Sequence, residues 1–131
     1  MREDQLRSIP FFQGLSKKEL KLLATQTDEL DVREGKELAT EGEFGHEFFV
    51  IERGTADVLR GGEKIRELGP GDFFGEIALL EEDRRTATVK ATSDMTVIVM
   101  TRQDFRALDR AEPGVHASVA EAIASRRAPS A

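Results

Sequence analysis

The apolar positions of the chain follow two different periods. Between residues 6 and 23 they recur at helical spacing, and Ser16 followed three residues later by Glu19 forms a capping-box pattern. From Asp28 onwards, apolar and polar residues alternate or gather in short apolar runs, as at residues 48–51, which is typical of strands. The pattern therefore predicts N-terminal helices over residues 1–27 and strands after them.

The strand region extends to residue 101 and is divided by tight turns. Gly61-Gly62 separates two alternating segments, which favours a hairpin. Gly69-Pro70-Gly71-Asp72 and Ser93-Asp94 mark further turns. About eight short strands at this spacing predict a mainly β fold, a sandwich or antiparallel jelly roll over residues 28–101.

Residues 102–127 return to a helical period. Thr101 is suited to be an N-cap, and Pro113-Gly114 divides the segment into two helices. The second helix carries a thin apolar stripe that is suited to packing on another surface. The stripe consists of Val115, Val119 and Ile123. We therefore expect two C-terminal helices, followed by a frayed tail at residues 128–131.

Composition narrows the function classes. The chain has 131 residues, the size of one domain, and it contains no cysteine, which excludes a disulfide framework and thiolate metal sites. The cytoplasm is the location that we infer from this. A net charge of −6 argues against direct binding of nucleic acid. No run of residues approaches the ~20 apolar positions of a membrane helix, so no membrane span is expected.

Residues 75–89 carry the chemistry that the rest of the chain leaves unexplained. Gly75 permits a close backbone approach to an anion, and the N–H groups at a helix start can donate to phosphate oxygens. Glu76 can accept hydrogen bonds from a sugar hydroxyl, and Arg85 supplies a counter-charge. The stretch therefore predicts a pocket for one small anionic ligand, most simply a nucleotide.

Metal and catalytic centres are not expected. Jelly-roll metal sites, as in cupins, need clustered histidines, whereas His46 and His116 lie far apart in the sequence. No serine, histidine and acid constellation is visible either. The sequence thus favours a binding module over an enzyme.

The motif positions resemble those of the cyclic nucleotide-binding domain family. The resemblance rests on G-P-G-D-F-F-G-E-I-A-L-L at residues 69–80 and R-T-A-T-V at residues 85–89, with supporting glycines upstream. This family includes the bacterial catabolite activator, regulatory subunits of cyclic-nucleotide-dependent kinases and the tails of nucleotide-gated channels. The resemblance spans residues 1–127. It implies an eight-stranded jelly roll flanked by N-terminal and two C-terminal helices, with a phosphate-binding cassette at residues 75–89.

The resemblance also assigns roles within the cassette. Arg85 would neutralise the exocyclic oxygens of the cyclic phosphate, and Glu76 would accept from the ribose 2′-hydroxyl. The phosphate cradle would be completed by the backbone at Gly75, Ile77, Ala78 and Thr86. Two plainer interpretations stay open. Arg85 would then be a surface arginine paired with Glu81 or Asp83, and Glu76 a solvated glutamate favoured by the helix dipole.

The base and its cap are less determined. Thr86 does not decide between adenine and guanine, and the apolar walls expected from Val58 and Phe74 lead us to predict cAMP over cGMP. Arg84 stands where many members have proline, which places a second positive charge near the phosphate and would loosen the loop. The chain has no Trp or Tyr to stack on the base. The replacement caps considered are Ile123, Arg126 and Arg127, or no cap at all.

The expected function is that of a cyclic nucleotide sensor which signals by moving its C-terminal helices. Leu79 and Leu80 are either core residues or the contact through which those helices detect the ligand. The partner would be an effector protein or a second copy, and the chain a stand-alone sensor or part of a larger receptor. A jelly-roll interaction module that has lost nucleotide binding is the alternative.

Overall fold

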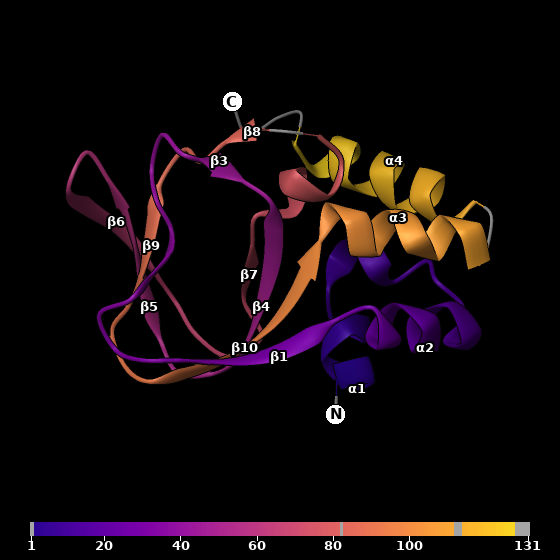
Figure 1. Cartoon of the computed structure of the whole chain (residues 1–131), viewed down its shortest axis with the longest axis horizontal. Helices are drawn as coiled ribbons and strands as arrows, with labels where there is room; N and C mark the ends of the chain where they lie inside the picture. The colour runs from indigo at the N-terminus through magenta and orange to yellow at the C-terminus, as the bar shows by residue number, and fades with distance from the viewer. Residues whose placement is uncertain (1, 82, 112–113, 128–131) are drawn as a thin grey trace.

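The computed structural model describes residues 2–81, 83–111 and 114–127 of the chain (Figure 1). The helices are α1 (Arg2–Arg7), α2 (Lys17–Thr25), α3 (Arg102–Ala111) and α4 (Val115–Arg127), with short 3-10 helices η1 (Pro10–Phe12) and η2 (Glu76–Leu79). The strands are β1 (Asp28–Val32), β2 (Glu37–Ala39), β3 (Phe44–Gly45), β4 (Glu47–Arg53), β5 (Ala56–Arg60), β6 (Glu63–Leu68), β7 (Phe73–Phe74), β8 (Asp83–Arg84), β9 (Thr88–Ala91) and β10 (Met95–Thr101).

Eight of these strands form two four-stranded antiparallel sheets. One sheet has the order β1-β10-β4-β7 and the other the order β2-β9-β5-β6. The remaining two strands, β3 and β8, pair with each other through Phe44 opposite Arg84 and Gly45 opposite Asp83. The mainly β fold with flanking helices is therefore confirmed, with β3–β8 as an additional short pair beside the eight-stranded roll.

The apolar run of β4 is explained by its place between two layers. Phe48 and Val50 pack into the core that the helices cover, whereas Phe49 and Ile51 pack into the core between the two sheets. Figure 1 shows the helices gathered on one side of this sheet and the second sheet on the other. A strand covered on both faces reads as a continuous apolar run, because successive side chains enter different cores.

The helices begin where the sequence predicts. Ser16 Oγ accepts from the Glu19 N–H at 3.1 Å, and Glu19 Oε1 accepts from the Ser16 N–H at 2.7 Å. Thr101 and Asp104 exchange equivalent bonds of 3.1 Å at the start of α3. These reciprocal bonds satisfy N–H groups that the first helical turn leaves without a partner.

The apolar stripe of α4 packs onto its own domain. Its three members are at most 1% exposed and lie in the helical core with Phe11, Phe12 and Phe105. The surface on which the stripe was expected to lie is therefore intramolecular. Residues 128–131, predicted to be a tail, are outside the described residues.

No described helix is long and apolar enough to cross a membrane. Nor does any group of three or more His, Asp or Glu side chains in the described ranges lie together as metal ligands would. His46 is exposed, and the side chain of His116 is outside the described set.

A buried carboxyl joins α1 to the sheet. Gln5 Nε2 donates to Glu52 Oε2 at 3.0 Å, while Gln5 Oε1 and Glu52 Oε1 are buried acceptors without a hydrogen-bond partner among the described residues. Burial and then the neighbouring Glu29 carboxyl raise the pKa of Glu52, and the Gln5 amide partly opposes this rise. Protonation of Glu52 is therefore easier in the folded state than in the unfolded state, and the protonated O–H can donate.

We expect Glu52→Gln to stabilise the domain at neutral pH and to have little effect in acid. The pKa of Glu52 in the folded state is above its usual value of 4.5. Protonation of Glu52 therefore contributes its full stabilisation below pH 4.5, and this stabilisation is lost as the pH rises through the folded-state pKa. Thermal unfolding measured from acid to neutral pH checks the prediction, with Glu63→Gln at an exposed position of β6 as the control. Parallel pH profiles for wild type and Glu52→Gln would contradict it.

Candidate nucleotide pocket

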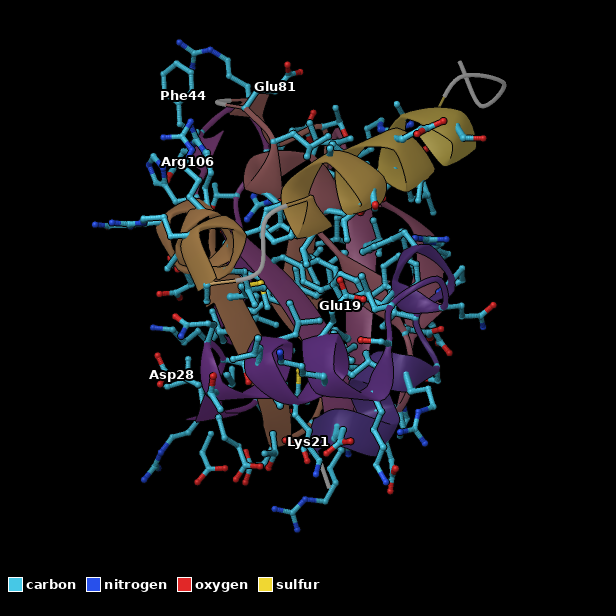
Figure 2. The ribbon with its side chains drawn as sticks, turned by 90° about the vertical axis from the view of Figure 1, so that its right-hand side faces the viewer. Glu19, Lys21, Asp28, Phe44, Glu81 and Arg106 are labelled. Carbon is cyan, nitrogen blue, oxygen red and sulfur yellow. The ribbon has the colours of Figure 1, made fainter. Side chains whose placement is uncertain are left out.

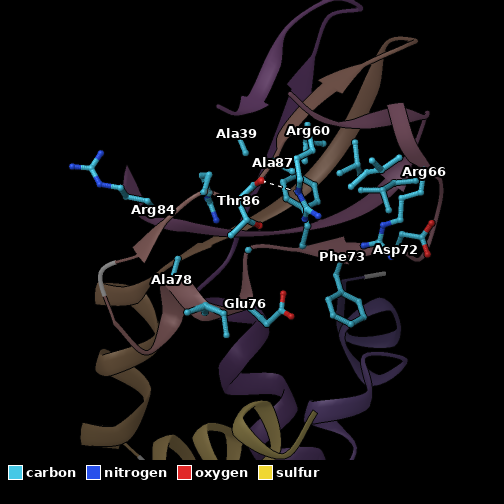
Figure 3. A pocket seen from close by; sticks show the side chains of 18 residues that line it. Ala39, Arg60, Arg66, Asp72, Phe73, Glu76, Ala78, Arg84, Thr86 and Ala87 are labelled. Atoms are coloured by element: carbon cyan, nitrogen blue, oxygen red, sulfur yellow. Dashed lines mark hydrogen bonds between the residues drawn. The ribbon is translucent and has the colours of Figure 1, made fainter. Parts of the chain in front are cut away.

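A cavity of about 770 Å³ lies between the β5–β6 hairpin and the segment from β7 through η2 to β9 (Figure 3). Every ligand-contacting residue predicted from the sequence lines it. These residues are Gly75, Glu76, Ile77, Ala78, Arg85, Thr86, Val58 and Phe74. The tertiary structure thus brings residues from β5, β7, η2 and the loop before β9 around one space.

Gly75 is the N-cap of η2 and has a left-handed backbone with φ of 84°. A Cβ at this position would stand 2.6 Å from both Arg85 Nη1 and the Glu47 carbonyl oxygen. Glycine is therefore needed here for two reasons: it adopts the left-handed backbone conformation easily, and it has no Cβ to clash with these two atoms. The Ala78 N–H, one of the predicted phosphate donors, already donates to the Gly75 carbonyl at 3.1 Å.

Arg85 extends from the loop after β8 and crosses the backbone of two glycines. A Cβ on Gly45 would collide with the Arg85 Nε and Cζ atoms, and one on Gly75 would approach Nη1. Arg85 Nη2 donates to the Glu47 carbonyl at 2.7 Å and is partly buried there. This bond holds the guanidinium at the pocket wall beside the η2 turn.

Gly45 and Glu47 support this arginine, and the sequence reasoning did not identify them. Gly45 is buried and its φ is not in the left-handed region, so its need for glycine comes from the close approach of the Arg85 side chain. A glycine inside a strand is the signal that was available, because it often marks the close approach of another group. Glu47 contributes only its carbonyl, which no side-chain pattern reveals.

Glu76 and Thr86 occupy different parts of the lining. Glu76 is half-buried, and Figure 3 shows its carboxylate directed into the space below Thr86. Thr86 is exposed, and its carbonyl accepts from Arg60 Nε at 3.2 Å across to β5. The pocket therefore has a carboxylate on η2 and basic groups on the facing wall.

Arg84 is tied to the β3 end of the domain. Its Nη1 donates to the Gly42 carbonyl at 2.7 Å, and its Cζ lies 4.3 Å from the ring centre of Phe44. Figure 3 shows the side chain pointing away from the pocket residues, and Figure 2 shows Phe44 at an extremity of the molecule. Arg84 thus joins β8 to the β3 region, whereas we expected it to loosen this loop and to charge the phosphate site.

Val58 and Phe74, the predicted apolar walls, line the pocket, whereas Ile123, one of the caps considered, does not. Val58 and Phe74 are buried, and Phe74 stacks on Phe49 with ring centres 4.9 Å apart. Ile123 is in the helical core and does not line the cavity, so it does not cap a base in this arrangement. The side chains of Arg126 and Arg127 are outside the described set. Sequence reasoning missed Arg60 and Arg66, which also line the cavity.

Comparison with known proteins agrees with this geometry. Residues 29–111 match the family model described as "Cyclic nucleotide-binding domain". The chain belongs to this family. The match includes both sheets and α3, and therefore every residue of the pocket lining.

Relatives of this cyclic nucleotide-binding domain are parts of longer proteins. A cAMP-dependent protein kinase regulatory subunit of Colletotrichum orbiculare is 36% identical over 110 residues, which is 82% of this chain and 28% of the relative. A cGMP-dependent protein kinase of Eimeria tenella is 39% identical over 82 residues, 63% of this chain and 8% of the relative. The matched part of the chain thus spans less than a third of the length of each of these two relatives.

A solved structure shares the fold over nearly the whole domain. The N-terminal domain of a transcriptional regulator from Streptomyces coelicolor A3(2) superposes with a TM-score of 0.86 at 25% sequence identity. The match covers 94% of this chain and 90% of that one. That domain therefore shares the N-terminal and C-terminal helices with this chain, in addition to the jelly roll.

The cassette of this cyclic nucleotide-binding domain contacts the C-terminal helices directly. Arg102 Nε, at the start of α3, donates to the Ala78 carbonyl at 3.1 Å. Leu79 is fully buried in the same core as Phe105 and Leu108, and Leu80 packs against that core. A hydrogen bond and burial in a shared apolar core thus join η2 to α3.

Proposed function

We propose that this domain binds a 3′,5′-cyclic nucleotide through residues 75–86. The observation that carries the proposal is the Arg85 guanidinium, held by the Glu47 carbonyl beside the Gly75 turn, in the same pocket as the Glu76 carboxylate. The guanidinium would bind the cyclic phosphate with paired N–H donors, and the carboxylate would accept from the ribose 2′-hydroxyl. The presence of both groups in the lining of one cavity supports a sugar-phosphate ligand.

The charge distribution supports an anionic ligand despite the net charge of −6. Apart from Arg84, whose side chain points away, three arginines line the cavity together with two carboxylates. The arginines are Arg60, Arg66 and Arg85, and the acids are Asp72 and Glu76. A cleft with basic groups attracts an anion even where the whole surface repels polyanions.

Titration calorimetry of the purified chain with cAMP and cGMP tests the proposal. We expect saturable one-to-one binding of at least one of the two. Because the chain contains neither Trp nor Tyr, absorbance in the purine band would also reveal a nucleotide carried through purification. Absence of heat with both nucleotides at millimolar concentration would overturn the assignment. It would favour the alternative of an interaction module without nucleotide.

We further propose that the ligand acts on the C-terminal helices. The Arg102 bond to the Ala78 carbonyl and the burial of Leu79 against Phe105 support this route. A ligand that moves η2 would change both of these contacts with α3. It can shift the C-terminal helices between two positions only to the extent that it binds one of the two conformations more tightly than the other. An effector protein or a second copy would respond to the change.

We expect nucleotide to change amide hydrogen exchange in α3 and α4, and Arg102→Gln to reduce that change by at least half. The truncated amide cannot reach the Ala78 carbonyl, whereas the cassette side chains stay in place. Exchange measured by mass spectrometry with and without ligand gives the readout, and Arg106→Gln on exposed α3 is the control. An equal ligand effect in wild type and Arg102→Gln would exclude this bond as the route.

A further inference from the structure

An exposed aromatic ring and a second arginine lie next to Arg85 but outside its pocket. Phe44 is 50% exposed, and the Arg84 Cζ atom lies 4.3 Å from the centre of its ring. The two residues are directly across from each other in the β3–β8 pair. Phe44 does not line the cavity, and Figure 3 shows the Arg84 side chain pointing away from it. Direct contact with a ligand in the pocket therefore does not account for these two side chains.

The position of Arg85 depends on the segment that contains Phe44. The Arg85 N–H donates to the Glu43 carbonyl at 2.8 Å, and the Gly42 N–H donates to the Arg85 carbonyl at 2.9 Å. The Arg85 guanidinium is held by the same segment, through its bond to the Glu47 carbonyl and its close approach to Gly45. Both the backbone and the side chain of Arg85 are therefore placed by residues of this one segment.

The β3–β8 pair is short and lies outside the two four-stranded sheets. Each of its strands has two residues, and Phe44 belongs to neither apolar core. A two-stranded pair is at best marginally stable by itself. Arg84 adds two contacts across the pair, because it stacks on Phe44 and its Nη1 donates to the Gly42 carbonyl at 2.7 Å. We call these two contacts the Phe44–Arg84 clip.

We propose that Phe44 and Arg84 are positioning residues, which hold Arg85 in place for the phosphate of the ligand. This inference rests on the proposed binding of a cyclic nucleotide. When the clip is open, residues 83–86 separate from residues 42–47, and the Arg85 guanidinium leaves the pocket wall. The apparent affinity then falls with the fraction of molecules in which the clip is closed. Arg84 thus promotes anion binding although its own charge points away from the pocket.

Phe44→Leu gives the sharpest test, because it changes no charge and alters a residue outside the cavity lining. An exposed cation–π contact is weak, so we expect the Kd for the nucleotide to rise by about threefold. Phe44→Tyr keeps the aromatic face and should keep the wild-type Kd. Calorimetry with the nucleotide that binds wild type more tightly gives both values. Wild-type affinity in Phe44→Leu would overturn the inference.

Arg84→Gln should raise the Kd by about fivefold, since glutamine loses both the stacking cation and the bond to the Gly42 carbonyl. Phe44→Leu should then have little further effect, because its partner is already absent. Neither substitution should change the Kd of Arg85→Ala, in which the positioned guanidinium is missing. Fully additive losses, or equal losses in the Arg85→Ala background, would show that the two residues act by another route.

Amide hydrogen exchange measures the clip directly, without ligand. In nucleotide-free Phe44→Leu, the N–H groups of Gly42 and Arg85 should exchange faster than in wild type, because their bonds join the two segments. Saturating nucleotide should restore their protection, and NMR resolves the two amides individually. Unchanged exchange of both amides in Phe44→Leu would contradict a positioning role.

Leu30→Ala is the control for the loss of an exposed apolar side chain. Leu30 is 47% exposed on β1 and does not line the cavity. This variant should keep the Kd within about twofold of wild type, as expected for a surface substitution. It should also leave the exchange of the Gly42 and Arg85 amides unchanged. Effects equal to those of Phe44→Leu would show a general loss of stability and overturn the inference.

The outcomes separate this inference from the proposed function. If neither cAMP nor cGMP binds wild type, nucleotide binding itself fails, and the positioning role fails with it. If wild type binds a nucleotide and Phe44→Leu binds it equally tightly, the positioning role fails and nucleotide binding stands. A higher Kd for Phe44→Leu that disappears in the Arg85→Ala background, together with faster exchange of the Arg85 amide, supports both.

Discussion

Arg85→Ala is expected to raise the Kd for the cyclic nucleotide by roughly thirty-fold or more. Removing one partner of a desolvated charge pair typically costs ~2–5 kcal/mol of binding free energy, much of it because the phosphate is left without its counter-charge. Arg85→Lys should give an intermediate loss, since a lysine keeps the charge but not the paired donors. Calorimetry with the nucleotide that binds wild type more tightly provides the measurement.

Lys90→Ala controls for the loss of one positive charge near the site. Lys90 is exposed on β9 and does not line the cavity, so its removal should leave the Kd within about twofold of wild type, as expected when exposed charges are screened. Thermal unfolding of each variant separates loss of affinity from loss of fold. Wild-type affinity in a folded Arg85→Ala variant would exclude the cassette assignment, although the family and the fold would stand.

Alanine at Gly45 and at Gly75 should have different consequences, although both glycines lie beside Arg85. For Gly75→Ala we expect the free energy of unfolding to fall by about 2–5 kcal/mol, because a left-handed backbone disfavours a Cβ and this Cβ also meets the Glu47 carbonyl. The three atoms nearest to the Cβ of Gly45→Ala all belong to the Arg85 side chain, which can move. Denaturant unfolding should therefore show a loss of only about 1 kcal/mol, the worth of one hydrogen bond.

Ligand affinity should nevertheless fall in Gly45→Ala, by roughly tenfold, which corresponds to about 1.4 kcal/mol. The displaced guanidinium would no longer be held by Glu47 at the pocket wall. A double-mutant cycle checks the cause, because Gly45→Ala should lower affinity in the wild-type background and have no further effect in Arg85→Ala. Equal losses in both backgrounds would show that Gly45 acts independently of Arg85.

Much of the fold follows from local patterns that each need only a few residues. The capping box at Ser16 and Glu19 and the hairpin at Gly61-Gly62 formed as predicted, since their hydrogen bonds and backbone angles are set within a short segment. The alternation of the strands predicted two faces. It did not show that β4 has a helical layer on one face and a second sheet on the other, since that depends on segments far away in the sequence.

The sequence by itself determined the short helix after Gly75, the set of polar groups that could hold a sugar-phosphate, and the family resemblance. These properties depend on residue type and close spacing. Only the tertiary structure decided what supports Arg85, where the α4 stripe lies and which other arginines line the cavity. Gly45 and Glu47 reach Arg85 from about 40 positions away, and Arg66 faces the cavity because β6 pairs with β5 in one register. Such placements follow from strand pairing and from packing between segments that are distant in the sequence. A local sequence pattern does not predict them.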